Sequence, residues 1–213
     1  MKKLFLSAIV LVSTVVSFAQ SEKFTAAMKT NLAAMDSAFK NPANLLTLSN
    51  NFERIADAEK TQWLPYYYAA FCQVNYGFMQ KDKDKMDGFA DKASLLIAKA
   101  DSLAPDNSEI SCIKSMIASC HMMVNPQQRW QEYGAESSSN MQDAMKQDST
   151  NPRPYFLKGQ GLKYTPESFG GGCKTAKPVL EIAQAKYATF KPATDMSPNW
   201  GKELVTKLIQ DCK

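Results

Sequence analysis

The sequence predicts an all-α fold of antiparallel helical hairpins, and three observations support this expectation. Proline is favoured at the first position of a helix when an Asn, Ser or Thr cap precedes it. No segment shows the alternating apolar pattern of a strand. Small and large apolar residues recur on one helical face. Five cap–proline pairs divide the chain, at Asn41-Pro42, Asn125-Pro126, Asn151-Pro152, Thr165-Pro166 and Ser197-Pro198.

The recurring face has the order small, large, small. Its clearest copy is formed by Ala93, Ile97 and Ala100, after which Pro105 ends the predicted helix. Small residues let two helix backbones approach closely, and the large residue fills the groove between them. Further copies are Ser137/Met141/Ala144, Ala176/Leu180/Ala183 and a degenerate one at Ser49/Phe52/Ala56. Self-similarity at this spacing indicates stacked helical hairpins.

The predicted helices fill a single domain, residues 20–213. They form about four hairpins followed by a C-terminal capping helix. We expect them at residues 21–39, 43–59, 63–79, 84–103, 108–123, 127–147, 153–163, 175–188 and 199–212.

These faces resemble the tetratricopeptide repeat (TPR) family, which carries small, large and small residues in the second helix of each hairpin. Its first helix has an aromatic residue followed four positions later by a small one, as in Tyr66/Ala70 and Tyr155/Gly159. Lys114 departs from that pattern, and the repeats are longer than the usual length of about 34 residues. The resemblance implies a TPR-like α-solenoid with a concave groove.

Two stretches resemble a group of exported helical-repeat proteins common in Bacteroidetes. Residues 52–56 leading to residues 63–68 are similar to its opening unit. Residues 169–172, Lys191-Pro192 and residues 198–201 are similar to its closing unit. The group has no assigned chemistry, so this resemblance implies fold and compartment only.

The N-terminus predicts a Sec-type signal peptide, residues 1–19. Lys2-Lys3 precedes an apolar run, and small residues before Gln20 place the cleavage site between Ala19 and Gln20. The run is shorter than the ~20 residues of a membrane anchor, which is the alternative interpretation. No Cys lies at the cleavage site, which disfavours a lipoprotein. We therefore expect a periplasmic or secreted protein without stable membrane insertion.

The charge of the mature chain disfavours nucleic acid as a partner. The net charge of the full sequence is +4, and loss of Lys2 and Lys3 leaves 23 basic against 21 acidic residues. A nucleic-acid-binding protein needs a concentrated basic face.

Five cysteines remain in the mature chain, an odd number. If the last two predicted helices are antiparallel neighbours, Cys173 and Cys212 lie together, and we expect a disulfide between them. Two unpaired thiols are the alternative. Any pairing of Cys72, Cys112 and Cys120 stays open, although most cysteines in such helices are buried as small apolar residues.

No catalytic or metal-binding motif emerges. His121 is the single histidine, which cannot supply a zinc site alone, and no C-x2-C pair occurs. Neighbouring Cys120 points about 100° away on a helix. A dyad of His121 with Cys72 or Cys112 is the remaining alternative. We expect no enzyme activity, no cofactor and no metal.

The predicted helix 63–79 carries more aromatic residues than one core can accommodate. We expect Trp63, Tyr66 and Tyr67 to form a binding groove, with Trp63 and Tyr67 exposed in it. The leading functional hypothesis is a binding or scaffold protein that holds a protein or peptide partner in this groove. The alternative is a periplasmic small-molecule or lipid carrier associated with a transporter. The oligomeric state stays open.

Overall fold

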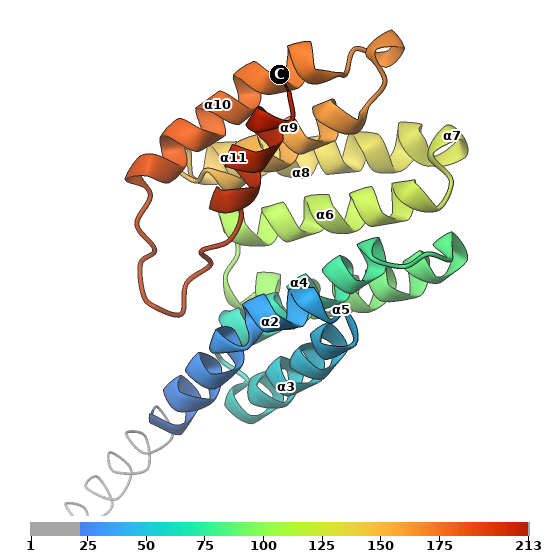
Figure 1. Ribbon diagram of the computed structural model, residues 1–213. Coiled ribbons are helices and arrows are strands. Elements are labelled where there is room, and N and C mark those ends of the chain that lie inside the picture. Colours follow the sequence, from blue (N-terminus) through green and yellow to red (C-terminus); the bar gives the residue numbers. More distant parts are fainter. Residues whose placement is uncertain (1–21, 213) are drawn as a thin grey trace, which may run out of the picture.

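The computed structural model describes residues 22–212, and the predicted signal peptide lies outside them. In this part of the chain every regular element is a helix, and no strand occurs (Figure 1). The prediction of an all-α fold with helical-hairpin packing is confirmed. The finer TPR-like solenoid assignment stays a prediction.

The helical elements follow one another with short connections. Residues 22–33 are helical. They are followed by α2 (Met35–Lys40), α3 (Ala43–Glu59), α4 (Trp63–Phe78), η1 (Lys83–Lys85), α5 (Met86–Leu103), α6 (Ser108–Val124), α7 (Pro126–Arg129), η2 (Trp130–Gly134), α8 (Ala135–Gln147), α9 (Arg153–Tyr164), η3 (Glu167–Phe169), α10 (Cys173–Thr189) and α11 (Lys202–Gln210).

Neighbouring helices pack in sequence order. Helix α4 lies against α3 and α5, α6 against α5 and α8, and α9 against α8 and α10. The small–large–small faces form the seams, and Ala176, Leu180 and Ala183 are all fully buried. Gly159 shows why a small residue is needed opposite this face, because a Cβ there would lie 2.6 Å from the Leu180 side chain.

Three predicted helices differ from those observed. The predicted helix 21–39 is divided by a turn at residue 34, which separates helical residues 22–33 from α2. The predicted helix 127–147 contains the π-helical turn η2 between α7 and α8. The predicted helix 199–212 begins only at Lys202, because Gly201 adopts a left-handed φ of 102°. A Cβ on Gly201 would lie 2.2 Å from the Tyr187 hydroxyl oxygen, so this turn requires glycine. The Ser197-Pro198 pair therefore starts no helix.

Residues 190–201 form a long non-helical connection between α10 and α11, which we call the strap. It leaves the end of α10 and extends toward the N-terminal helices before returning to α11, as the red loop in Figure 1 shows. The Asp195 carboxylate at its tip lies 2.6 Å from the Lys29 ammonium. This ion pair links the strap, near the C-terminus, to the first helix of the described residues.

The buried side chains form two clusters, one from the N-terminal helices up to α6 and one from α9, α10 and α11. Leu157 and Trp200 pack against both. The Trp200 ring stacks on Phe71, with ring centroids 5.1 Å apart, and meets Phe156 edge to face at 6.1 Å. One residue of the strap therefore holds the two clusters together.

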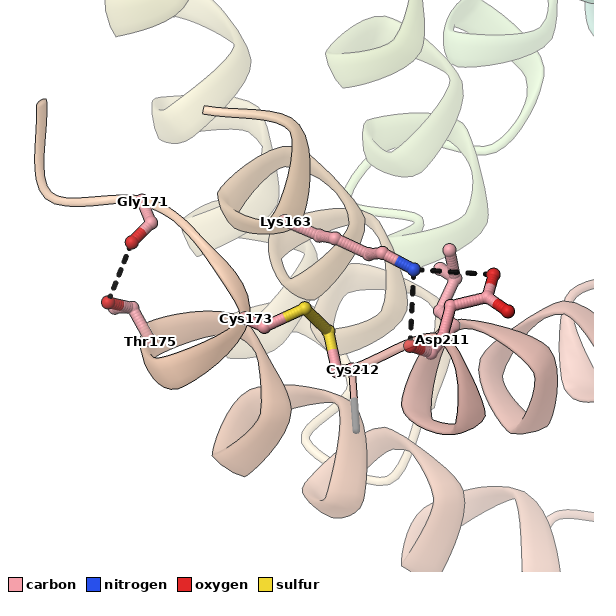
Figure 2. Close-up of a disulfide and its surroundings, with 7 residues drawn as sticks. Lys163, Gly171, Cys173, Thr175, Asp211 and Cys212 are labelled. Carbon is pink, nitrogen blue, oxygen red and sulfur yellow. Dashed lines mark hydrogen bonds and ion pairs between the residues drawn. A yellow bond between two sulfur atoms is a disulfide. The ribbon is translucent and has the colours of Figure 1, made fainter. Parts of the chain in front are cut away.

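A disulfide joins Cys173, the first residue of α10, to Cys212, which follows α11 (Figure 2). The two Cα atoms are 5.2 Å apart. Beside the disulfide, the Lys163 ammonium lies 3.3 Å from the carbonyl oxygen of Leu208 and 3.4 Å from the Asp211 carboxylate. The remaining cysteines, Cys72, Cys112 and Cys120, are buried thiols.

None of the described helices is both long enough and apolar enough to cross a bilayer. Within residues 22–212, no group of three or more His, Cys, Asp or Glu side chains is placed to hold a metal ion.

Candidate functional site

A cleft of about 500 Å³ opens where the strap approaches α4, α6 and the connection between α8 and α9. Its volume lies in the range of small-molecule sites in proteins. The lining residues are Trp63, Asn107, Glu109, Asp148, Thr150, Thr189, Phe190, Lys191, Ala193, Ser197 and Pro198.

Two half-buried aromatic side chains give the cleft its apolar surface. Trp63 is the first residue of α4, and Phe190 is the first residue of the strap. The Trp63 ring is fixed by Tyr67, which it meets edge to face with centroids 5.6 Å apart. Lys191 follows Phe190, is exposed and also lines the cleft, so the cleft carries a positive charge at its strap side.

A buried polar network lies next to the cleft, centred on Glu109 in the first turn of α6. Its Oε1 accepts hydrogen bonds of 2.8 Å from both Asn151 Nδ2 and Arg153 Nη1. Its Oε2 accepts a longer bond of 3.3 Å from the Tyr67 hydroxyl. In turn, the Trp200 indole N–H donates to that hydroxyl at 2.7 Å. The network therefore connects α4, α6, α9 and the strap.

Arg153 is the largest fully buried side chain of the described residues. Besides Glu109, its guanidinium donates to the backbone carbonyl of Pro198 in the strap. The guanidinium carbon lies 4.8 Å from the Phe190 ring centroid and 5.3 Å from the Trp200 ring centroid, a cation–π arrangement. Burial raises the pKa of the Glu109 carboxyl, and the positive charge of Arg153 opposes that rise.

Of the three residues predicted to form a binding groove, only one lines the cleft. Trp63 lines the cleft. Tyr66 is buried, with the Lys99 ammonium 5.2 Å from its ring centroid. The expectation that Tyr67 is exposed is wrong, because its side chain is fully buried under Trp200 and the strap. A strap that folds back from residue 200 to residue 67 leaves no local signal in the sequence.

Imidazole, sulfur and phenol side chains are missing from the described lining of the cleft. Among the described residues that line it there is no His, Cys, Met or Tyr. His121 lies twelve residues after Glu109 on α6, which places it about 18 Å farther along the helix axis. There its Nδ1 is 2.7 Å from Asp87 Oδ1, and its ring stacks on Tyr133. His121 therefore belongs to a separate cluster with Asp87 and Tyr133.

Among solved structures, the HusA haemophore from Porphyromonas gingivalis is similar to this chain in both sequence and fold. The two are 39% identical, with a TM-score of 0.80, over 89% of this chain and 92% of that chain. The chain belongs to the HusA family. No protein-family model and no curated protein matches it.

Membership of the HusA family fits the earlier resemblance to a helical group common in Bacteroidetes, since HusA is a protein of that phylum. Sequence reasoning missed Glu109, Arg153, Phe190 and Lys191. In the sequence, Lys191-Pro192 stands out only as part of the closing unit. The carboxylate and guanidinium that pair are 44 residues apart, so only the folded chain brings them together.

Proposed function

We propose that this HusA-family chain is an exported, non-enzymatic binding protein that carries haem in the cleft between Trp63 and Phe190. The single observation that carries the proposal is the 39% identity over nearly the whole chain to a haemophore. The small-molecule alternative is thereby favoured over a protein or peptide partner. Export rests on the predicted signal peptide.

The cleft suits the general chemistry of a porphyrin. Haem has a flat apolar macrocycle, two carboxylate groups and a central iron. Trp63 and Phe190 offer aromatic surfaces to the macrocycle. Lys191 offers a cation to a carboxylate, while Asp148 and Glu109 disfavour a carboxylate at the inner side. Since none of the usual ligands of haem iron (His, Cys, Met or Tyr) is among the described residues that line the cleft, we infer that contacts to the macrocycle and its carboxylates provide the binding energy.

This mode of binding predicts that the iron is dispensable. We expect the purified mature protein to bind hemin and metal-free protoporphyrin IX with dissociation constants within about tenfold of each other. Titration monitored by the Soret band and by tryptophan quenching measures both. If hemin binds and protoporphyrin does not, a side chain ligates the iron and this cleft is not the site. If neither binds, the proposed function is wrong.

Replacing Trp63 by alanine tests the site within the same titration. Loss of a central aromatic contact is expected to weaken hemin binding by at least about tenfold. Trp130 provides the matched control, because it is 58% exposed on η2 and does not line the cleft. Equal effects of Trp63→Ala and Trp130→Ala would contradict the placement of the ligand.

Lys191 is predicted to bind a carboxylate of the ligand. Lys191→Glu should weaken hemin binding about five- to tenfold at low ionic strength, and less in high salt, because exposed charges are screened. The control is Lys207→Glu, an exposed lysine on α11 outside the cleft. A loss of affinity that is independent of salt, or equal in the two variants, would exclude this role.

A further inference from the structure

We propose that the strap is a lid, with Trp200 as the pin that holds it down and the Lys29–Asp195 ion pair as a clasp at its tip. This inference deepens the proposed function, since it concerns how a ligand enters and leaves the same cleft. It rests on the strap's contacts with the body of the protein, its ends and its place in the wall of the cleft.

The strap forms one side of the cleft, and the body of the protein forms the other. Trp63, Asn107, Glu109, Asp148 and Thr150 belong to the body. The strap side consists of Phe190, Lys191, Ala193, Ser197 and Pro198, next to the last residue of α10, Thr189. Movement of the middle of the strap away from the body therefore widens the cleft.

Most of the hydrogen bonds that hold the strap against the body end on the strap's carbonyl groups. The Tyr68 hydroxyl donates to the Met196 carbonyl at 2.8 Å, and Arg153 donates to the Pro198 carbonyl. The remaining bonds of the strap's middle are internal, between Thr194 and Ser197. The strap can therefore leave the body with its own turn intact.

The Trp200 side chain packs against both buried clusters. Its indole N–H donates to the buried Tyr67 hydroxyl, and its ring stacks on Phe71. Because Tyr67 also bonds Glu109 at the cleft, the pin and the cleft belong to one network. Withdrawal of Trp200 breaks this connection.

The backbone of the strap is anchored at both ends when its middle moves and the Trp200 side chain withdraws. At one end the strap continues α10, and at the other the Tyr187 hydroxyl donates to the Trp200 carbonyl at 2.9 Å. The Cys173–Cys212 disulfide keeps α10 and α11 together, so the strap is part of a covalently closed loop. Gly201, at the start of α11, has the left-handed φ of a turn that other residues rarely adopt. A segment with two anchored ends and a glycine turn moves as a flap.

The clasp gives a clean test because it lies outside the cleft. Lys29 and Asp195 are 52% and 65% exposed, and neither lines the cleft. Asp195→Lys places two lysines together at the tip. The double variant Lys29→Asp with Asp195→Lys restores an ion pair in which the two charges have exchanged positions. The probe is hydrogen exchange of the Trp200 indole N–H, measured by NMR on the ligand-free mature protein.

We expect Asp195→Lys to speed this exchange about two- to fivefold, and the charge-swapped variant to return it to the wild-type rate. Tyr68→Phe, which removes only the bond to Met196, should speed it about two- to tenfold. The Phe156 amide of α9 reports the whole fold and should not change. Unchanged indole exchange in both variants, or an equal increase at Phe156, would overturn the lid.

The second measurement is stopped-flow binding of hemin to the same variants. The association and dissociation rates of hemin should both rise in Asp195→Lys, and the affinity should change less than either rate. Both rates should return to their wild-type values in the charge-swapped variant. Faster indole exchange with unchanged hemin rates would overturn gating by the strap. A wild-type protein that fails to bind hemin contradicts the proposed function, and the indole exchange still decides whether the strap opens.

Discussion

Replacing Glu109 by alanine is expected to lower the free energy of unfolding by about 3–5 kcal/mol, because it leaves a buried cation without its counter-charge. Arg153 is fully buried, and Glu109 is only 14% exposed. The substitution also deprives Asn151 and Tyr67 of an acceptor. Urea unfolding followed by circular dichroism measures the loss.

The matched control for Glu109→Ala is Asp101→Ala, which removes an ion pair of similar length at the surface. Lys114 and Asp101 are 2.8 Å apart but 32% and 39% exposed. Exposed pairs contribute about 0–1 kcal/mol. A loss below about 1 kcal/mol for Glu109→Ala, or equal losses in the two variants, would show that the network adds little to stability.

Removal of the disulfide is the second large effect. The double variant Cys173→Ser with Cys212→Ser should lose about 4 kcal/mol, since the bond closes a long loop and limits the freedom of the unfolded chain. The two cysteines are 39 positions apart in sequence. Unfolding of the wild type with and without a reducing agent should reproduce the same loss.

The reducing agent should have no effect on the double variant, because its remaining cysteines are buried thiols that it cannot alter. Wild-type protein that is equally stable with and without reductant would contradict a stabilising disulfide. Non-reducing peptide mapping of the wild type should give one mixed fragment containing both Cys173 and Cys212.

The fold could be predicted from the sequence because its determinants are local. Ala93, Ile97 and Ala100 lie on one helical face, and all are buried as that spacing predicts. Asn125, which precedes a proline, caps α7 by accepting a hydrogen bond from the Gln128 N–H. Signals of this kind act within a few residues, so they can be recognised in the sequence without knowledge of the tertiary structure.

The site was predicted only in part because its determinants are distant in sequence. Trp63 begins a helix rich in aromatic residues, which made it a candidate. By contrast, Trp200 was placed in a helix, although it lies in the strap and bonds Tyr67 across 133 positions. Glu109 and Arg153 resemble ordinary surface charges at the starts of their helices. The packing of α6 on α9, together with the strap that covers Arg153, buries them.

The three buried thiols have a consequence for oxidative folding. Burial raises the pKa of the Cys120 thiol to about 12 and raises those of Cys72 and Cys112 as well. Because the thiolate is the form that attacks a disulfide, these cysteines are inert in the native state. An unfolded chain offers five reactive thiols and many wrong pairs. If the helices pack before oxidation, three of these thiols are buried. Cys173 and Cys212 are then the two that form a disulfide.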